Sequence, residues 1–259
     1  MIARNETFYQ VVPARPADPH RSRTRVMPAA GSGSRFGPGV RKQYAPLEGR
    51  TVIEWALAPF LADRRCAQLV VALARDDADW KTVAARLAAS GASAVTSVEG
   101  GERRSDSVRR ALASLAASAS PSDWVLVHDA ARPCLDPADL GRLLDRLGTH
   151  PVGGLLATRV SDTLKRTARI GGGADPPVTE TVERSDLWRA LTPQMFRFGP
   201  LCAALDGAHA AGRFPSDEAQ ALEWLGERPV LVEGDSMNLK ITLAADLALA
   251  AAVLRARRA

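Results

Sequence analysis

The segment Pro28-Ala-Ala-Gly-Ser-Gly-Ser-Arg-Phe-Gly37 is the part of this 259-residue chain from which the rest is best understood. A short strand-like piece, residues 25–28, leads into a loop of small residues. Glycine has no Cβ, so a phosphate can approach the backbone and accept hydrogen bonds from its N–H groups. Two cations, Arg35 and Lys42, follow closely. They favour a polyphosphate-binding loop over the alternative, a flexible turn after a strand.

The spacing of the glycines excludes two familiar phosphate loops. A dinucleotide fingerprint, G-x-G-x-x-G, needs its third glycine one residue before Gly37. A Walker loop needs a Lys-Ser or Lys-Thr pair after its last glycine, and none follows Gly37. The loop is therefore of a third kind, and its spacing argues against an NAD site and against ATP hydrolysis.

The composition is that of a globular protein, with 46% hydrophobic and 24% charged residues. No run of 18 apolar residues occurs, so we expect no membrane-spanning helix and no membrane partner. The formal net charge of +5 suits an anionic ligand. It also leaves nucleic acid as an alternative, which the scattered placement of the basic residues disfavours.

The cysteines and histidines form no metal-binding pattern. The three cysteines, Cys66, Cys134 and Cys202, stand alone, and the four histidines are equally scattered. This pattern makes a zinc site improbable and fits free thiols in a reducing cytoplasm, which is the location we expect.

Alternating strand-like and helical segments predict an α/β fold with a parallel sheet. A capping box, Thr51 to Glu54, opens a helix in which Pro59 should cause a kink or an early end. Ser105, Asp136 and Thr242 are expected to cap later helices. The strands are expected at residues 68–74, 94–98, 124–128, 153–160 and 229–232, and the other helices at 76–89, 105–115, 136–147, 201–211, 217–225 and from 242 onward.

Two regions depart from this alternation or precede it. Residues 1–24 are polar and weakly periodic, and we expect them to be a disordered extension of a single domain, 25–259. Within that domain, residues 161–187 are polar and centre on a Gly/Pro-rich turn, with extended pieces at 163–167 and 178–182. They predict a projecting β-hairpin that packs on a second subunit, because a hairpin alone is only marginally stable.

Polar clusters follow several of the strands, where open α/β sheets bind ligands. Gly101 to Ser107 could hold a base edge, or could be an ordinary turn. Asp129 could bind Mg²⁺ carried on phosphates, or could form only a local ion pair with Arg132. Lys240 lies between two apolar residues and should point into a cleft or pair with a carboxylate. The segments 191–194 and 216–219 are each interpretable as a cap or turn.

Taken in order, these clusters resemble the 2-C-methyl-D-erythritol 4-phosphate cytidylyltransferase family from about residue 25 to residue 254. The matching pieces are PAAGSGSRFG, KQY, GGERRSDSV, VLVHDAARP, DTLKR, TVERSDLWRALTPQ, SDEAQALE, VEG and NLKIT.

The resemblance implies a three-layer α/β sandwich with a mostly parallel twisted sheet, of the nucleotide-diphospho-sugar transferase type. It implies a homodimer joined through the arm at residues 161–187. The implied reaction transfers CMP from CTP to 2-C-methyl-D-erythritol 4-phosphate, with Mg²⁺ or another divalent cation, and releases pyrophosphate in isoprenoid biosynthesis. A CTP-dependent transferase acting on another polyol phosphate, such as ribitol 5-phosphate, remains the alternative.

The resemblance also assigns roles to individual residues. Asp129 would ligate a Mg²⁺ held mainly by the CTP phosphates. The catalytic residues would be Arg35, Lys42, Arg184 and Lys240. The CTP-binding residues would be Ala29, Ala30, Gly31, Gly33, Gly101, Glu102, Ser107, Asp129 and Ala130. The sugar-phosphate-binding residues would be Arg132, Thr163, Arg184, Thr192, Ser216 and Lys240, with Thr163 and Arg184 supplied by the partner's arm.

Three residues depart from what the family usually has. Arg41 stands in place of a proline, Glu102 in place of an aspartate, and Ser216 in place of a threonine. None of these differences removes a charge that the implied chemistry requires. The sequence offers no physical role for Arg41.

Overall fold

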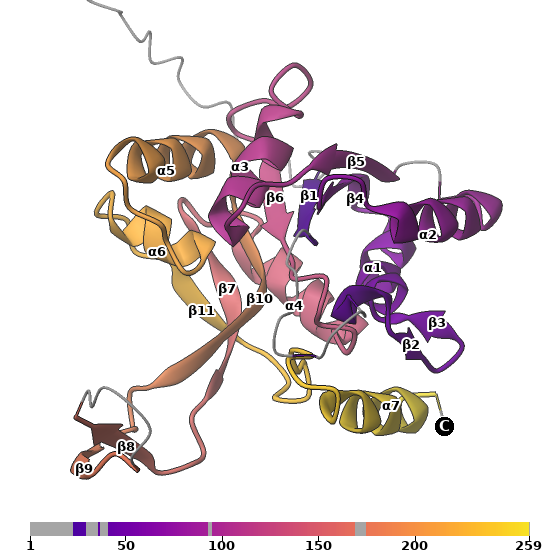
Figure 1. The fold of residues 1–259 in the computed structure, drawn as a ribbon. Helices are drawn as coiled ribbons and strands as arrows, with labels where there is room; N and C mark the ends of the chain where they lie inside the picture. Colours follow the sequence, from indigo (N-terminus) through magenta and orange to yellow (C-terminus); the bar gives the residue numbers. More distant parts are fainter. Residues whose placement is uncertain (1–22, 30–35, 37–40, 93–94, 169–174, 259) are drawn as a thin grey trace, which may run out of the picture.

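A seven-stranded sheet, in the order β11-β7-β10-β6-β1-β4-β5, organises the chain (Figure 1). The computed structural model describes residues 23–29, 36, 41–92, 95–168 and 175–258. Every neighbouring pair is parallel except those of β10, which runs antiparallel to both β6 and β7. The strands are β1 (Arg23–Pro28), β4 (Cys66–Leu73), β5 (Val95–Glu99), β6 (Trp124–Val127), β7 (Gly153–Arg159), β10 (Trp188–Arg197) and β11 (Val230–Glu233).

Helices cover both faces of the sheet because both faces of its central strands are apolar. In β4, Leu69 and Val71 pack with one helical layer, and Val70 packs with the other. The prediction of a three-layer α/β sandwich with a mostly parallel sheet is confirmed. The first layer holds α1 (Val52–Ala62), α2 (Ala78–Ala89) and α4 (Pro137–Leu147), and the second holds α3 (Arg104–Ala113), α5 (Phe198–Ala210) and α6 (Glu218–Glu223).

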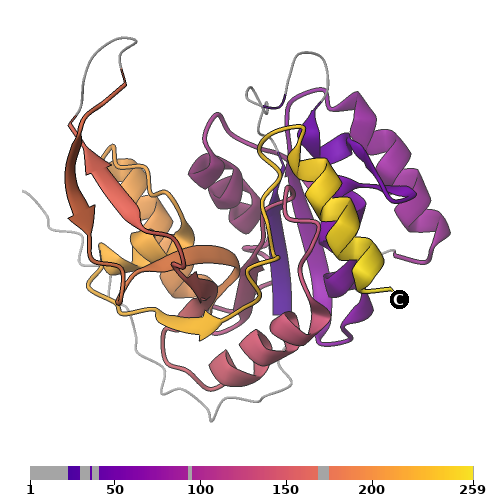
Figure 2. The ribbon, with the colours of Figure 1, turned by 90° about the horizontal axis from the view of Figure 1, so that it is seen from below.

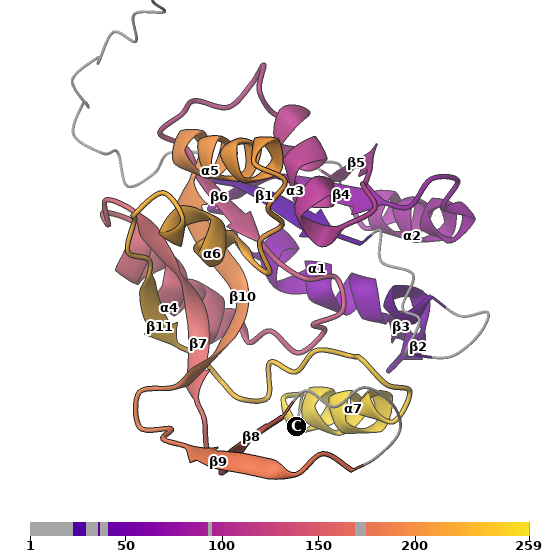
Figure 3. The same cartoon turned by 60° about the vertical axis from the view of Figure 1, so that its left-hand side comes forward.

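A third, smaller cluster surrounds α7 (Asp246–Ala256), away from both layers. There Leu254 packs with Leu47 of β2 (Pro46–Leu47), which pairs with β3 (Arg50–Thr51) (Figures 1 and 3). The same cluster holds Ile241, so it supports the segment that carries Lys240.

The strand β10 was not expected from the sequence, which suggested a cap or turn at residues 191–194. Proline is rare inside a central strand because it cannot donate to the ladder. Here the register with β7 shifts between Ala190 and Gln194, so Pro193 lies in an irregularity and pairs with neither neighbour. The strand continues on both sides of it.

The predicted hairpin is confirmed as β8 (Leu164–Thr167) paired antiparallel with β9 (Val178–Val182). It lies at the end of the extended β7 and β10 and projects away from the sandwich (Figures 1 and 2). Almost all of its side chains are exposed or half-exposed. None of the described residues covers it, and its packing on a second subunit stays a prediction.

The helix boundaries correct three expectations and confirm one. Helix α1 continues past Pro59 to Ala62. Ser105 lies inside α3, and Arg103 is the residue before that helix. Helix α7 begins at Asp246, whose carboxylate accepts hydrogen bonds from the backbone N–H groups of residues 242 and 243, so Thr242 does not cap it. Asp136 caps α4 as expected, because its side chain accepts from the N–H of Ala138.

No helix in the described ranges is long and apolar enough to cross a lipid bilayer.

The buried carboxylate of Glu54 ties the start of α1 to α2. It accepts hydrogen bonds from the backbone N–H and the hydroxyl of Thr51 at 2.8 and 2.6 Å, which completes the predicted capping box. It also accepts two from the guanidinium of Arg86, at 2.8 and 2.9 Å. Burial alone would raise the pKa of Glu54, but these hydrogen bonds outweigh it and lower the pKa.

We expect Glu54→Gln to lower the free energy of unfolding by about 1–3 kcal/mol at pH 7, because hydrogen bonds to a buried charge are lost. The folded-state pKa lies below the unfolded one, so this contribution is present above the unfolded value, about 4.3, and is lost as the pH falls from there through the lower folded-state value. Urea titrations of both proteins at pH 7 and pH 3 measure the difference. Glu180→Gln, in the exposed pair with Arg166, is the control and should change stability by less than about 1 kcal/mol. An equal difference at both pH values would contradict the role assigned to the ionised carboxylate.

Candidate active site

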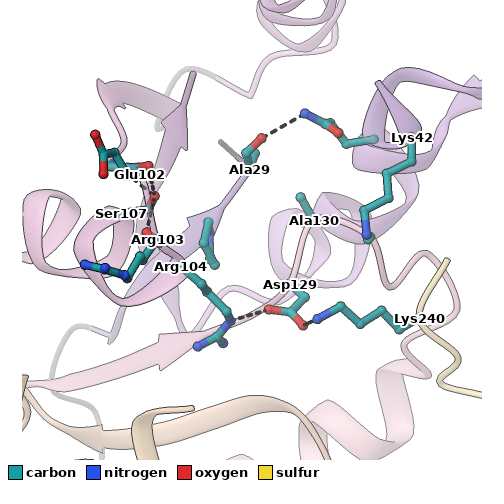
Figure 4. Close-up of a pocket in the computed structure, with 13 residues that line it drawn as sticks. Ala29, Lys42, Glu102, Arg103, Arg104, Ser107, Asp129, Ala130 and Lys240 are labelled. Carbon is teal, nitrogen blue, oxygen red and sulfur yellow. Dashed lines mark hydrogen bonds and ion pairs between the residues drawn. The ribbon is translucent and has the colours of Figure 1, made fainter. Parts of the chain in front are cut away.

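A pocket opens at the carboxyl ends of β1, β5 and β6 (Figure 4). The chain proceeds from β1 to β4 and β5 on one side and then returns to β6 on the other, so loops after β1 and β6 diverge there. Such a switch point is where open α/β sheets bind ligands. The pocket is lined by Pro28, Ala29, Lys42, Gln43, Gly101, Glu102, Arg103, Arg104, Ser107, Asp129, Ala130, Ala131 and Lys240.

A buried carboxylate, Asp129, lies at the base of the pocket between two cations. Its Oδ1 is 2.8 Å from Nε of Arg104, and its Oδ2 is 2.7 Å from Nζ of Lys240 (Figure 4). Burial would raise the pKa of Asp129, but the positive charges of Arg104 and Lys240 outweigh it and hold the pKa well below its usual range. Asp129 is therefore ionised at neutral pH. The expectation that Lys240 meets a carboxylate is confirmed, whereas Arg132 lies 3.9 Å away and makes at most a weak contact.

Arg104 is a site residue that sequence reasoning missed. Besides Asp129, its guanidinium contacts both carboxylate oxygens of Glu218 at 2.6 and 2.9 Å, and Glu218 is 1% exposed. It thus connects α3, the end of β6 and α6. Its place in the glycine-rich segment after β5 was the available signal, but no spacing rule indicates a partner 114 residues away.

A chain of hydrogen bonds behind the pocket fixes the backbone of Asp129. The N–H of Asp129 donates to Oγ1 of Thr192 at 3.1 Å, and that hydroxyl is 2.9 Å from Nδ1 of His128. Nε2 of His128 lies 3.2 Å from the carbonyl oxygen of Arg132, which can only accept. The proton is therefore on Nε2, and Thr192 donates to Nδ1. Burial lowers the pKa of His128 to about 4, so the ring is neutral.

The segment that carries Lys240 is anchored from the loop after β6. Arg132 donates from Nη1 to the carbonyl oxygen of Asn238 at 2.6 Å, and Asn238 donates from Nδ2 to that of Thr192 at 2.8 Å. The N–H of Ile241 donates to the carbonyl oxygen of Ala131 at 2.8 Å. These bonds flank Lys240 on both sides and leave its ammonium directed at Asp129.

The loop from Gly101 to Ser107 is shaped by its own polar groups. Gly101 donates its N–H to Oγ of Ser107 at 3.1 Å, and that hydroxyl lies 3.1 Å from the carbonyl oxygen of Arg103. A Cβ at Gly101 would lie 2.3 Å from Cβ of Asp106, so only glycine fits. The loop can therefore present backbone groups to a planar ligand at the mouth of the pocket.

Lys42 enters the pocket from a 3₁₀ turn, η1 (Lys42–Tyr44). The next residue, Gln43, is buried and donates from Nε2 to the carbonyl oxygen of Ala29 at 2.8 Å, which ties the turn to the end of β1. In Figure 4 the side chain of Lys42 reaches from this turn toward the pair formed by Asp129 and Lys240.

The structure brings about half of the residues proposed from the sequence into one pocket. Arg132 and Thr192 lie behind it and support it, Ser216 is exposed beside α6, and Thr163 and Arg184 lie on the arm. Ala30, Gly31, Gly33 and Arg35 fall outside the described residues. Those that line the pocket are Ala29, Lys42, Gly101, Glu102, Ser107, Asp129, Ala130 and Lys240.

The donors that the structure describes in this pocket would suit a divalent cation that is bound mainly by a substrate's phosphates. Among the described residues, no group of three His, Cys, Asp or Glu side chains could enclose a metal ion. Mg²⁺ is typically bound by one or two carboxylates and by substrate phosphates, which is what the ionised Asp129 can offer.

Many of the described basic residues form ion pairs or lie over aromatic rings. Guanidinium groups lie over four of the five tryptophans, at 3.7 to 4.7 Å from the ring centroids. Nucleic-acid binders without base-specific contacts use exposed aromatic faces for stacking. These faces are covered, which weakens the nucleic-acid alternative.

Comparison with known proteins agrees with the geometry. The family model for 2-C-methyl-D-erythritol 4-phosphate cytidylyltransferase matches residues 24–256. The enzyme of that name from Halorhodospira halophila is 53% identical over 235 residues, which are 90% of this chain and 94% of that protein. The one from Vibrio vulnificus is 44% identical over 87% of this chain and 91% of its own length.

Solved structures agree as well. A crystal structure of a 4-diphosphocytidyl-2C-methyl-D-erythritol synthase superimposes with a TM-score of 0.76 at 35% identity, covering 90% of this chain and 99% of its own. The cytidylyltransferase from Thermus thermophilus superimposes with a TM-score of 0.69 at 31% identity, covering 90% and 98%. The chain therefore belongs to the 2-C-methyl-D-erythritol 4-phosphate cytidylyltransferase family.

Proposed function

We propose that this chain transfers the CMP group of CTP to 2-C-methyl-D-erythritol 4-phosphate and releases pyrophosphate, as a nucleotidyltransferase of isoprenoid biosynthesis. The observation that carries the proposal is the convergence of Lys42 and Lys240 on one pocket that also holds the ionised Asp129. These residues come from the two ends of the chain. A site with separate cations suits a reaction between two phosphorylated substrates.

The acceptor needs no general base. A phosphate monoester has a second pKa of about 6 and is largely dianionic near pH 7, so it is already a nucleophile. The barrier comes from its repulsion by the triphosphate of CTP. Cations must offset this repulsion while they hold the attacking oxygen in line with the phosphorus.

The positions of the cations suggest which phosphate group each one would bind. Lys42, with Arg35 from the glycine loop, would stabilise the negative charge that builds on the triphosphate during attack. Lys240 lies across the pocket and would bind the acceptor phosphate. Because Lys240 now pairs with Asp129, the acceptor phosphate would have to compete with that carboxylate for the ammonium.

The nucleotide would lie along the glycine-rich loops. Gly101, Glu102 and Ser107 would bind the cytosine, and Ala29 to Gly33 would approach the phosphates through the backbone. Asp129 would hold the metal that accompanies CTP. When bound, Mg²⁺ would neutralise charge on the triphosphate and orient it.

The projecting hairpin supports a homodimer with shared active sites. Thr163 and Arg184 are exposed on the arm and do not line the pocket around Asp129. In this proposal they reach the acceptor site of the partner subunit. Each acceptor site would also use Arg132, Thr192 and Ser216 of the subunit that holds it. The cytoplasm, where the thiols stay reduced, is the proposed location.

The proposed reaction is tested by pyrophosphate release from CTP and Mg²⁺ with either of two acceptors. We expect turnover with 2-C-methyl-D-erythritol 4-phosphate, much slower turnover with ribitol 5-phosphate, and none after EDTA removes the divalent cation. Excess Mg²⁺ should restore the rate. No turnover with either acceptor would contradict the proposed function, and faster turnover with ribitol 5-phosphate would identify the alternative transferase.

Lys42→Ala should lower kcat by about 100-fold or more, because removal of one preorganised contact to developing charge typically has an effect of that size. The fold should survive, since the side chain lies in an open pocket. Steady-state kinetics and a thermal melt check this. Lys81→Ala, on the exposed face of α2, is the control and should match wild type. Near-wild-type turnover of Lys42→Ala would show that its assigned role is wrong.

Arg184→Ala should raise KM for the sugar phosphate more than KM for CTP if the arm completes the partner's acceptor site. Mixed dimers of Arg184→Ala and Lys42→Ala subunits should then recover activity, because one of the two sites holds both intact residues. Differently tagged subunits, purified as heterodimers, allow this measurement. Heterodimers without recovered activity would place Arg184 in its own subunit's site or outside it.

A further inference from the structure

The carboxylate of Asp77, in the loop between β4 and α2, makes a different contact from the helix cap that its position predicts. Asp77 is the residue that precedes α2, yet its side chain accepts no capping hydrogen bond from that helix. A capping Asp normally stabilises a helix start. The side chain is instead 2% exposed, and its Oδ2 lies 2.8 Å from Nη1 of Arg41.

Among the described residues, Arg41 is the cation that lies against the Asp77 carboxylate. Neither oxygen of the Asp77 carboxylate has a partner in good hydrogen-bond geometry among the described residues, and the same holds for Nη1 of Arg41. A buried charge is costly unless an opposite charge lies close to it. Arg41 is the cation that meets this requirement at Asp77.

Tyr44, at the other end of the turn, lies near the same carboxylate, although its hydroxyl has no partner in good hydrogen-bond geometry among the described residues. In a 3₁₀ turn, residues three apart lie on the same side, and the N–H of Tyr44 donates to the carbonyl oxygen of Arg41 at 2.9 Å. Burial and the negative charge of Asp77 raise the pKa of the Tyr44 hydroxyl above its usual value, so the group stays protonated. Asp77 therefore anchors the start of the turn through Arg41, and Gln43 fixes its middle to Ala29.

Lys42 lies between Arg41 and Gln43 and lines the pocket. Its two neighbours therefore anchor the turn, Arg41 through Asp77 and Gln43 through Ala29. We propose that Arg41 and Asp77 are positioning residues, whose ion pair sets the place of Lys42 in the pocket. This inference rests on the proposed function, in which Lys42 stabilises the triphosphate.

The arrangement has a consequence for kinetics. A misplacement of about 1 Å in a catalytic group lowers rates by up to about 100-fold. Removal of the ion pair should therefore displace Lys42 and lower kcat. The KM for the acceptor should change little. A purely structural role would lower the melting temperature without changing the turnover of the folded protein.

The experiment is a double-mutant cycle on the full-length protein. Arg41→Met keeps the aliphatic stem, and we expect it to lower kcat about 10- to 100-fold. Asp77→Asn should have a similar effect, and the two changes together should cost no more than either alone. Arg41→Lys keeps the charge and should recover part of the loss. In a Lys42→Ala background, Arg41→Met should lower kcat no further.

The matched control is Arg65→Met. Arg65 is 40% exposed against 34% for Arg41, and it pairs with Asp63 at 2.6 Å after α1, away from the pocket. The Arg65→Met variant should have the wild-type kcat. Thermal melts of every variant show whether the measured protein is folded. If Arg41→Met or Asp77→Asn fails to fold, the comparison of Arg41→Lys with wild type carries the test, since a displaced charge should still lower kcat.

Three results would overturn the proposal: wild-type kcat in folded Arg41→Met, wild-type kcat in Arg41→Lys when the other variants do not fold, or a full additional loss in the Lys42→Ala background.

If the wild-type protein shows no turnover, the proposed function fails by itself. The affinity for CTP with Mg²⁺, measured by calorimetry, then tests the positioning. Weaker binding by Arg41→Met that disappears in the Lys42→Ala background supports it, and unchanged affinity contradicts it.

Discussion

The carboxylate of Asp129, held between Arg104 and Lys240, is the interaction on which the rest of the site depends. It joins the end of β6 to α3 on one side and to the segment before α7 on the other. Arg104 extends the connection to the buried Glu218 of α6. Removing Arg104 would leave the buried Glu218 without its cation, which is far more costly than an exposed pair that breaks. The charges that the proposed reaction needs thus also hold the elements of the pocket together.

The backbone behind Asp129 is as constrained as its side chain. Thr192, from β10, accepts the N–H of Asp129 and donates to a neutral His128, which in turn donates to the carbonyl oxygen of Arg132. This chain requires β10 to lie beside β6 and to be irregular at residues 191–193, where its ladder with β7 shifts. The antiparallel strand is therefore part of the site as well as part of the sheet.

The structure shows what sequence reasoning missed at three positions. β10 escaped detection because Pro193 is a strong signal against a central strand, and the irregularity that accommodates it is visible only in three dimensions. Thr192 and Arg132 are predicted to bind the acceptor, and their hydrogen bonds to Asp129 and Asn238 also support the loop of Asp129 and the segment of Lys240. Arg41, which had no explanation in the sequence, has a buried partner 36 positions along the chain, and no local pattern could indicate it.

The sequence by itself determined the class of the fold, the glycine-rich loop with its cations, the arm, and the family, because these depend on local periodicity and on the order of short motifs. The tertiary structure alone decided which charges meet. Ion pairs between Lys240 and Asp129, Arg104 and Glu218, or Arg41 and Asp77 join residues far apart in the chain. The strength of such a pair depends on distance and on burial, since both set how far water weakens it. Neither quantity exists until the sheet has brought the ends of its strands together.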